Sequence, residues 1–287
     1  MSTRASPNAA TPALARRLSP TSRPGGGLGP LLRAQVGAEL RSGARVPEFL
    51  IGTVAIPVML FLMFGVPNAR FELPGGTSMM TLMMPSFGAF GILSLVIFSF
   101  GVEIANERGR GWLRLMRSTP VPAWVYFAGK LAMTLVFGIV LVAGLFAVGA
   151  AVGVRMPLER WAAAFGVLLL GGMSLATIGF ALGYLARPRT ASTIANLVYL
   201  PLAFASGFFF PLSQLPAFLQ DLAPYLPTYH YGRLVWGTIG PPEAVTAFTG
   251  IEPGNLALHV TFLVGTFVAF GVLALWGYGR DRSREAA

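Results

Sequence analysis

Six long apolar stretches dominate the pattern of this chain, and short polar or charged segments separate them. About 20 apolar residues in a helix cross the roughly 30 Å hydrocarbon core of a bilayer. The stretches that reach or approach this length are Phe49–Gly65, Met79–Val102, Leu131–Val154, Trp161–Ala186, Thr193–Leu212 and Val260–Gly279. Each is expected to be helical, because lipid offers no partner to a free backbone N–H or C=O group. We therefore predict an all-α, polytopic membrane protein with six transmembrane helices.

Composition supports a membrane protein and excludes several soluble classes. The chain is 54% hydrophobic and 11% charged, whereas soluble domains carry about 25% charged residues. The net charge of +10 would suggest nucleic acid in a soluble protein, but the basic residues cluster between apolar runs, so we expect no nucleic-acid partner. The chain has no Cys, only two His and no close cluster of acids, so neither a disulfide framework nor a metal site is expected.

The distribution of positive charge predicts the orientation of the spans, because Lys and Arg concentrate on the cytoplasmic side. Seventeen of the 21 Lys and Arg residues lie in the N-terminal segment, the second-to-third connection, the fourth-to-fifth connection and the C-terminal tail. The other three connections hold only Arg70, Arg155, Arg160 and Arg233. Both termini are therefore predicted to face the cytoplasm of a bacterial inner membrane.

Three regions follow from this plan. Residues 1–27, rich in Pro, Gly, Ser and Ala, are expected to form a disordered cytoplasmic tail. No apolar region follows Arg16 and Arg17 until Phe49, so this tail is not expected to be a signal peptide. Residues 28–279 form the six-span domain, and residues 280–287 a second cytoplasmic tail. Within the domain, apolar residues at helical spacing over Leu28–Val46 predict an amphipathic helix on the cytoplasmic leaflet; a solvated linker is the alternative.

The connection after the second span, Glu103–Lys130, has the spacing of a short helix at the membrane edge. Its basic residues Arg110, Arg114 and Arg117 share one face, and Trp112 and Leu115 lie on the other. Pro120 and Pro122 are expected to end this helix before the third span begins. The simpler interpretation is an ordinary positively charged loop.

A second unusual segment, Ser206–Leu234, follows the fifth span. It is too short and too rich in Pro to cross the membrane, so we predict a re-entrant or interfacial hairpin on the outer side. We expect its aromatic residues to lie at the level of the lipid headgroups, together with His230, which is interpreted as an interfacial residue without a catalytic role. These aromatic residues are Tyr225, Tyr229, Tyr231 and Trp236.

The two segments carry a family resemblance. The first motif is Glu107-Arg108, Gly111, Leu115, Thr119-Pro120 and Gly129-Lys130. The second is Ser206-Gly207-Phe208, Phe210-Pro211, Leu215-Pro216 and Leu226-Pro227-Thr228. In this order, on a six-span plan, the chain resembles the membrane (permease) subunit of a type-2 ATP-binding-cassette exporter. It has Gly111-Trp112 where many members of that family have Gly-Thr.

The resemblance implies roles for both segments. Glu103–Ser118 would be the coupling helix that docks on an ATPase subunit, Leu28–Val46 an interfacial connecting helix, and Phe208–Leu234 an outer gate. The residues it assigns to coupling are Glu103, Glu107, Arg108, Arg110, Gly111, Arg114, Arg117, Thr119 and Pro120. Those it assigns to the outer gate are Phe208, Phe210, Pro211, Leu215, Pro216, Pro227 and Tyr229.

The chain itself has no Walker loop, because Gly129-Lys130 lacks the preceding glycine and the following Ser or Thr. The expected complex is two copies of this permease with two ABC ATPase subunits that bind ATP and Mg²⁺, so the permease itself needs no cofactor. Membrane lipids surround it, and an amphipathic or lipid-linked drug, antibiotic, glycan or lipid would enter from the bilayer.

Other functions remain open. An ion-coupled secondary transporter is disfavoured because the six predicted spans hold no Asp, Glu, Lys or Arg in their cores. A lipid-modifying enzyme would need converging acids, His residues or a metal, and the outer connections show no such spacing. A structural or assembly protein is the remaining alternative.

Overall fold

The computed structural model describes residues 28–45, 51–112, 115 and 122–286. Its elements at and near the N-terminal side are α1 (Leu28–Ala44), η2 (Ile51–Ala55), α3 (Ile56–Leu60), η3 (Phe61–Gly65), η4 (Val66–Asn68), β1 (Glu72–Leu73), β2 (Thr77–Ser78), α4 (Met79–Val96), η5 (Ile97–Val102) and α5 (Glu103–Gly109). They are followed by α7 (Ala123–Ala151), α8 (Leu158–Ser174), α9 (Ala176–Leu185), α10 (Ala191–Ala205), η6 (Leu212–Gln214), α11 (Ala217–Leu222), η7 (Ala223–Tyr225), α12 (Pro227–Ile239), α13 (Pro242–Thr249) and α14 (Leu256–Ala286).

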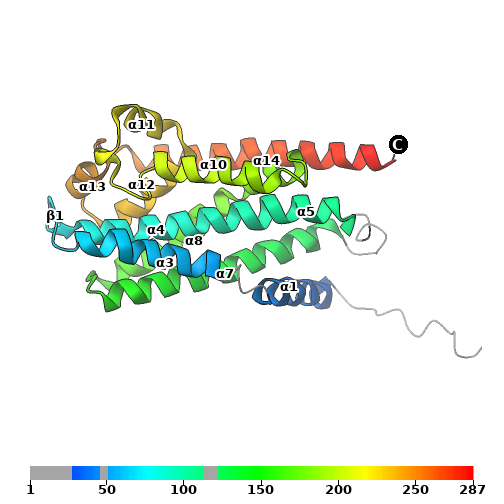
Figure 1. Cartoon of the computed structure of the whole chain (residues 1–287), viewed down its shortest axis with the longest axis horizontal. Helices are drawn as coiled ribbons and strands as arrows, with labels where there is room; N and C mark the ends of the chain where they lie inside the picture. The colour runs from blue at the N-terminus through cyan, green and yellow to red at the C-terminus, as the bar shows by residue number, and fades with distance from the viewer. Residues whose placement is uncertain (1–27, 46–50, 113–114, 116–121, 287) are drawn as a thin grey trace, which may run out of the picture.

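The long helices run side by side, and this confirms the prediction of a helical membrane protein (Figure 1). Four helical runs are long and apolar enough to cross a membrane: Met79–Gly109, Trp124–Ala151, Leu158–Leu185 and Leu256–Asp281. Two shorter apolar helices, Gly52–Asn68 and Ala191–Ala205, correspond to the predicted first and fifth spans. The described strands form only a two-stranded antiparallel hairpin that pairs Glu72 with Ser78 and Leu73 with Thr77.

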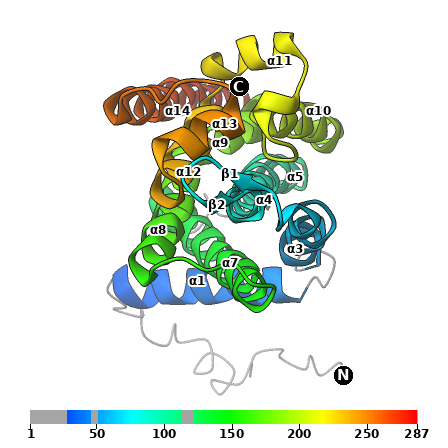
Figure 2. The ribbon, with the colours of Figure 1, turned by 90° about the vertical axis from the view of Figure 1, so that its left-hand side faces the viewer.

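Helix α4 lies at the centre of the bundle, with other helices around it (Figure 2). Nearly its whole length is buried, from Met80 to Val96 and including Pro85. Close packing continues where α9 crosses η5: a Cβ on Gly179 would lie 2.6 Å from the carbonyl oxygen of Val96, and one on Gly183 2.5 Å from that of Phe100. Two glycines four residues apart therefore allow the backbones of these helices to touch.

Two predicted helix boundaries were wrong. The second long helix does not end at Val102 but continues through η5 and α5 to Gly109, so most of the described part of the predicted coupling helix is the end of this helix. The third begins at Ala123, eight residues before the predicted Leu131, and contains Lys130. Sequence reasoning excluded these residues because they are charged. In the structure these residues lie within the helices, because the ammonium group of Lys130 contacts the carboxylates of Glu103 and Glu107.

The predicted outer hairpin lies at the end of the bundle opposite α1, where α11, α12, α13 and the β1–β2 hairpin gather (Figure 1). Of the four aromatic residues expected at the headgroup level, only Tyr225 is exposed, at 74%. Tyr229, Tyr231 and Trp236 are buried, as is His230, so these side chains face other helices and not lipid, and their level relative to the headgroups stays a prediction. They lie on α12, which packs against α4, α8 and α14. Whether the segment is re-entrant stays a prediction.

Candidate functional site

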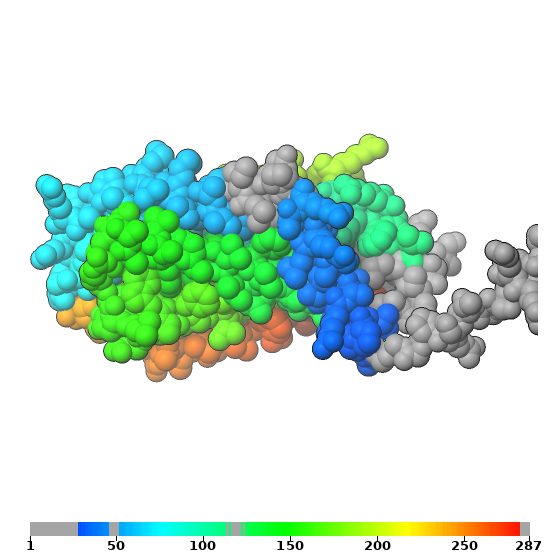
Figure 3. All heavy atoms as spheres, turned by 90° about the horizontal axis from the view of Figure 1, so that it is seen from below, coloured from blue at the N-terminus to red at the C-terminus, as the bar shows by residue number. Residues whose placement is uncertain are grey.

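Helix α1 lies across α7 at the end of the bundle away from the β1–β2 hairpin (Figure 3). The crossing depends on two glycines, one on each helix. A Cβ on Gly129 would lie 2.7 Å from Cγ of Gln35, and a Cβ on Gly43 would lie 2.7 Å from Cε2 of Phe137. Leu40 packs against the same small cluster as Phe137. Part of the predicted apolar face of α1 therefore faces α7.

Close to this crossing, one lysine side chain lies among three carboxylates. Lys130 is completely buried. Its Nζ is 3.0 Å from Oε1 of Glu107, 3.4 Å from Oε2 of Glu39 and 3.5 Å from Oε1 of Glu103. These groups come from α1, α5 and α7, so the ion cluster joins three elements that are far apart in sequence. A buried charge needs such partners, because removal from water costs several kcal/mol per ion.

Neighbouring polar side chains complete the ion cluster. The Tyr126 hydroxyl donates a hydrogen bond to Oε2 of Glu107, and the Gln35 amide donates one to Oε1 of Glu39 at 3.0 Å. Burial raises the pKa of Glu39, Glu107 adds to this effect, and Lys130 opposes it. With three acids and one base, the cluster holds an excess of acidic groups around the buried Lys130.

A second ion pair attaches α5 to the last helix. Arg108 Nη2 lies 2.7 Å from Oδ1 of Asp281, and Nε donates to Oδ2 at 3.2 Å. Its Nη1 also donates to the carbonyl oxygen of Gly183, on α9, at 2.7 Å. The guanidinium group thus contacts both a carboxylate and a helix end, the fork geometry for which Arg is suited. The end of α5 is held on one side by the Lys130 cluster and on the other by Asp281.

The residues assigned to coupling therefore divide into two groups. Glu103, Glu107 and Arg108 make their contacts within the protein. Arg110 is exposed after the end of α5, and Gly111 has a φ of +74°, a left-handed turn that suits glycine. The remaining assigned residues lie outside the described residues: Arg114, Arg117, Thr119 and Pro120.

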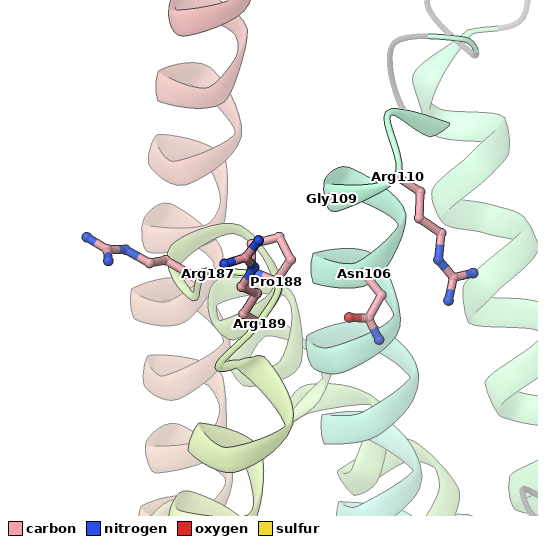
Figure 4. Close-up of a pocket in the computed structure, with 6 residues that line it drawn as sticks. All are labelled: Asn106, Gly109, Arg110, Arg187, Pro188 and Arg189. Carbon is pink, nitrogen blue, oxygen red and sulfur yellow. The ribbon is translucent and has the colours of Figure 1, made fainter.

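An open cavity of about 560 Å³ lies beside this turn and is lined by Asn106, Gly109, Arg110, Arg187, Pro188 and Arg189. Figure 4 shows that Arg110 and Arg187 point to opposite sides, with Arg189 between them. The backbone at Gly109 packs closely against Pro188 in this cavity, since a Cβ on Gly109 would lie 2.8 Å from Cβ of Pro188. Three arginines and no acid make this a basic surface, which favours an acidic partner. We call it the basic notch.

The residues assigned to the outer gate do not form one surface. Phe208 and Tyr229 are buried in the core, and Phe208 contacts Trp236 at 6.3 Å between ring centroids. Phe210 is exposed at 37% and lies 5.6 Å from the ring of Phe64. Among the others, Pro211 is buried, Leu215 and Pro227 are half-buried, and Pro216 is exposed.

Hydrogen bonds, and no ion pair among the described residues, hold the polar side chains at the α12 end. Tyr231 donates to the carbonyl oxygen of Leu168 at 2.6 Å, and Trp236 donates to Ser86 at 2.9 Å. His230 and His259 face each other with their Nδ1 atoms 2.7 Å apart. Burial lowers the pKa of His230. Because Nε2 of His230 is 2.9 Å from the carbonyl oxygen of Pro224, it carries the proton, and Nδ1 of His259 donates to Nδ1 of His230.

Sequence reasoning missed several members of these sites: Gln35, Glu39, Tyr126, His259 and Asp281. Only spacing could have indicated some of them, since Gln35 and Glu39 are four residues apart, as are Tyr126 and Lys130. The contact between Glu39 and Lys130 joins residues 91 positions apart, and no local pattern predicts it. Across the described ranges no three His, Asp or Glu side chains are grouped as metal ligands.

Comparison with known proteins identifies the family. The family model described as ABC-2 family transporter protein matches residues 69–276. The Bacillus subtilis protein YvfS, named a transport permease, is 24% identical over 208 residues, which cover 72% of this chain and 84% of that relative. The Escherichia coli protein YbhR, named a multidrug ABC transporter permease, is 25% identical over 188 residues, covering 58% of this chain and 50% of YbhR. The Bacillus subtilis transmembrane protein YxlG is 31% identical over 165 residues, which cover 55% of this chain and 58% of YxlG.

Proposed function

Because this chain belongs to the ABC-2 transporter family, we propose that it is the membrane subunit of an ATP-driven exporter whose ATP is hydrolysed by a separate subunit. The observation that carries this proposal is the family match over residues 69–276, which includes most of the helical bundle and the basic notch. The chain is a multi-pass membrane permease. Its ATPase partner, direction of transport and substrate belong to the proposal.

The arrangement around α5 supports coupling to such a partner. A segment that transmits the movement of an ATPase must be held firmly by the rest of the protein. Helix α5 is held by the Lys130 cluster and by the Arg108–Asp281 pair. The exposed turn at Arg110 and Gly111 follows directly. The basic notch adds Arg187 and Arg189 from a different connection, so an acidic ATPase surface would contact two connections at once.

The proposed topology has six crossings, with α1 and both termini on the cytoplasmic side of a bacterial inner membrane. Four long helices and the two shorter apolar ones support this number. The clustering of Arg on the segments at the α1 end supports the orientation. Two copies of the chain would form the path, moving between inward and outward access as ATP binds and is hydrolysed.

We propose an amphipathic or lipid-linked substrate that enters from the bilayer. Large apolar side chains are exposed along the spans, for instance Leu170 at 74% and Leu275 at 72%, which suits contact with lipid or with an apolar substrate. The buried Lys130 and the partly buried Glu103 and Glu107 weaken one argument against ion coupling, because these charged residues lie within helices long enough to span. The family match nevertheless favours ATP coupling.

The test is to purify the tagged full chain from its native membranes and to identify the chains that copurify. We expect a Walker-motif subunit in about equal amount, with Mg²⁺-dependent and vanadate-sensitive ATP hydrolysis. The double variant Arg187→Ala/Arg189→Ala should lose this subunit about tenfold, since each exposed charge contact contributes up to about 1 kcal/mol.

The matched control is Arg70→Ala, an exposed arginine at the other end of the bundle. It should retain the ATPase. A monodisperse wild-type protein without any Walker-motif partner would overturn the proposal and favour an ion-coupled transporter. Equal retention by the double variant and the control would place the ATPase contact away from the basic notch. Glu107→Ala would be a poor choice here, because that side chain faces Lys130 and its loss would act on stability.

A further inference from the structure

Four arginines break the charge pattern that places basic residues at the α1 end, and two of them share a cavity. Arg155 and Arg160 line a cavity of about 410 Å³ between the β1–β2 hairpin, the turn from α7 to α8 and the end of α12. The β1–β2 hairpin faces the viewer in Figure 2, at the end opposite α1. Among the residues that line the cavity these arginines are the only charged ones, and hydroxyl groups of Thr77, Ser78 and Thr81 are the other polar side chains.

Backbone carbonyls fix both guanidinium groups through one nitrogen each. Nη1 of Arg160 donates to the carbonyl oxygen of Ile239 at 2.8 Å. Nη1 of Arg155 donates to the carbonyl oxygens of Ala150 at 2.8 Å and Val154 at 3.3 Å. No carboxylate pairs with either group in the described part of the chain, and their Nε and Nη2 atoms make no hydrogen bond there. Oriented guanidinium groups with free donors are suited to binding a phosphate oxygen pair.

Two turns leave room for a ligand. Gly76, with a φ of +73°, and Gly153, with a φ of +106°, both line the cavity, and a Cβ on either would meet nothing within 4 Å. Leu158, which follows the lining residue Pro157 at the start of α8, is 81% exposed. An anionic group held by the arginines would therefore lie near a helix end that exposes an apolar side chain.

We propose that this cavity binds a phosphate-bearing headgroup at the membrane surface, with Arg155 and Arg160 as its ligands. An anionic phospholipid fits both parts, because its phosphate would contact the guanidinium groups while its acyl chains pass Leu158. Basic pockets between membrane helices bind anionic headgroups in this manner on the cytoplasmic side, and this cavity would do so at the opposite, outer end. Free phosphate shares the headgroup chemistry but makes no use of Leu158. The site is independent of any ATPase subunit.

The lipid arm of the test uses the full chain in nanodiscs of phosphatidylglycerol and phosphatidylcholine in equal parts. Native mass spectrometry after mild extraction measures how much of each lipid stays bound. We expect phosphatidylglycerol to be enriched on the wild type, and Arg155→Gln/Arg160→Gln to reduce that enrichment about tenfold, since each arginine near an anionic surface contributes about 1 kcal/mol. Arg160→Lys, which keeps the positive charge but loses the paired donors of the guanidinium group, should reduce the phosphatidylglycerol enrichment less.

The control is Arg70→Gln, an exposed arginine near the same hairpin that does not line the cavity; it should bind lipid as the wild type does. The second arm titrates inorganic phosphate against the protein in phosphatidylcholine nanodiscs and follows thermal unfolding. A phosphate-dependent shift that the double variant lacks, without lipid enrichment, would keep the site and assign it to free phosphate. A double variant that elutes and unfolds like the wild type and still binds both ligands equally would overturn the proposal.

Discussion

The two ends of the helical bundle stabilise their buried polar groups in different ways. At the α1 end, Lys130 lies among three carboxylates from α1 and α5. At the α12 end, Tyr231, Trp236 and His230 form hydrogen bonds between neutral groups. Burying an ion cluster costs more free energy than burying neutral hydrogen-bonded groups, and removing one charged partner from it costs more still. A neutral hydrogen bond contributes only about 1 kcal/mol to stability. The α1 end is thus the one where a single side chain decides whether several elements stay together.

The largest expected effect is that of Lys130→Met. Removal of the buried ammonium group leaves Glu39, Glu107 and the partly exposed Glu103 without their shared positive partner, so we expect a loss of about 3–5 kcal/mol in the free energy of unfolding. Thermal unfolding in detergent measures it. Lys130→Arg, which retains the charge, should lose clearly less. Equal stability of Lys130→Met and the wild type would show that the cluster does not hold α1, α5 and α7 together.

The next effect concerns the crossing of α1 over α7. In Gly129→Leu the new side chain would collide with Gln35, whose Cγ would lie 2.7 Å from the added Cβ. We expect a loss of about 1–3 kcal/mol and faster trypsin cleavage at Arg33 and Arg41 as α1 leaves α7. Gly144→Leu, on the same helix, is the control, because its Cβ meets only Val54, at 3.8 Å. Similar cleavage of both variants would contradict this packing.

At the α12 end, where even the buried Arg233 makes only hydrogen bonds among the described residues, Tyr231→Phe should cost about 1–1.5 kcal/mol. The variant keeps the ring but leaves the buried carbonyl of Leu168 without its donor. Tyr225→Phe, at the same end and 74% exposed, should change the free energy of unfolding little. Chemical denaturation of the two variants measures their free energies of unfolding. If Tyr231→Phe lost as much stability as Lys130→Met, the contrast between the two ends would be contradicted.

The smallest effects are those of pH, and they have opposite signs at the two ends. Burial raises the pKa of Glu39, so its contribution to stability is complete below 4.5 and is lost as pH rises through the raised pKa. Burial lowers the pKa of His230, so its contribution is complete above 6.5 and is lost as pH falls through the lowered pKa. Melting temperatures measured against pH should lose the first slope in Glu39→Gln and the second in His230→Gln. Unchanged slopes in both would contradict these assignments.

The contrast also explains which parts of the molecule could be predicted. The helical membrane class and the approximate positions of the spans follow from run length, since bilayer thickness acts on each segment alone. The ends of the second and third helices were wrong by several residues, because Glu103, Glu107 and Lys130 look like loop residues in isolation. The burial of Tyr229 and Tyr231 could not be predicted for a similar reason: an aromatic residue in a Pro-rich segment gives no sign of which helix will cover it.

The amino-acid sequence by itself determined that the chain enters a membrane as a set of apolar helices, and its motifs pointed to the family. Only the tertiary structure decided where individual charges lie. Lys130 is buried because Glu39, 91 residues earlier, and two turns of α5 reach it from other elements. Arg155 and Arg160 are oriented because carbonyl groups at the ends of α7 and α12 hold them. Hydrophobic run length is a local property that each segment carries alone, whereas the cost of a charge depends on partners that only folding brings within reach.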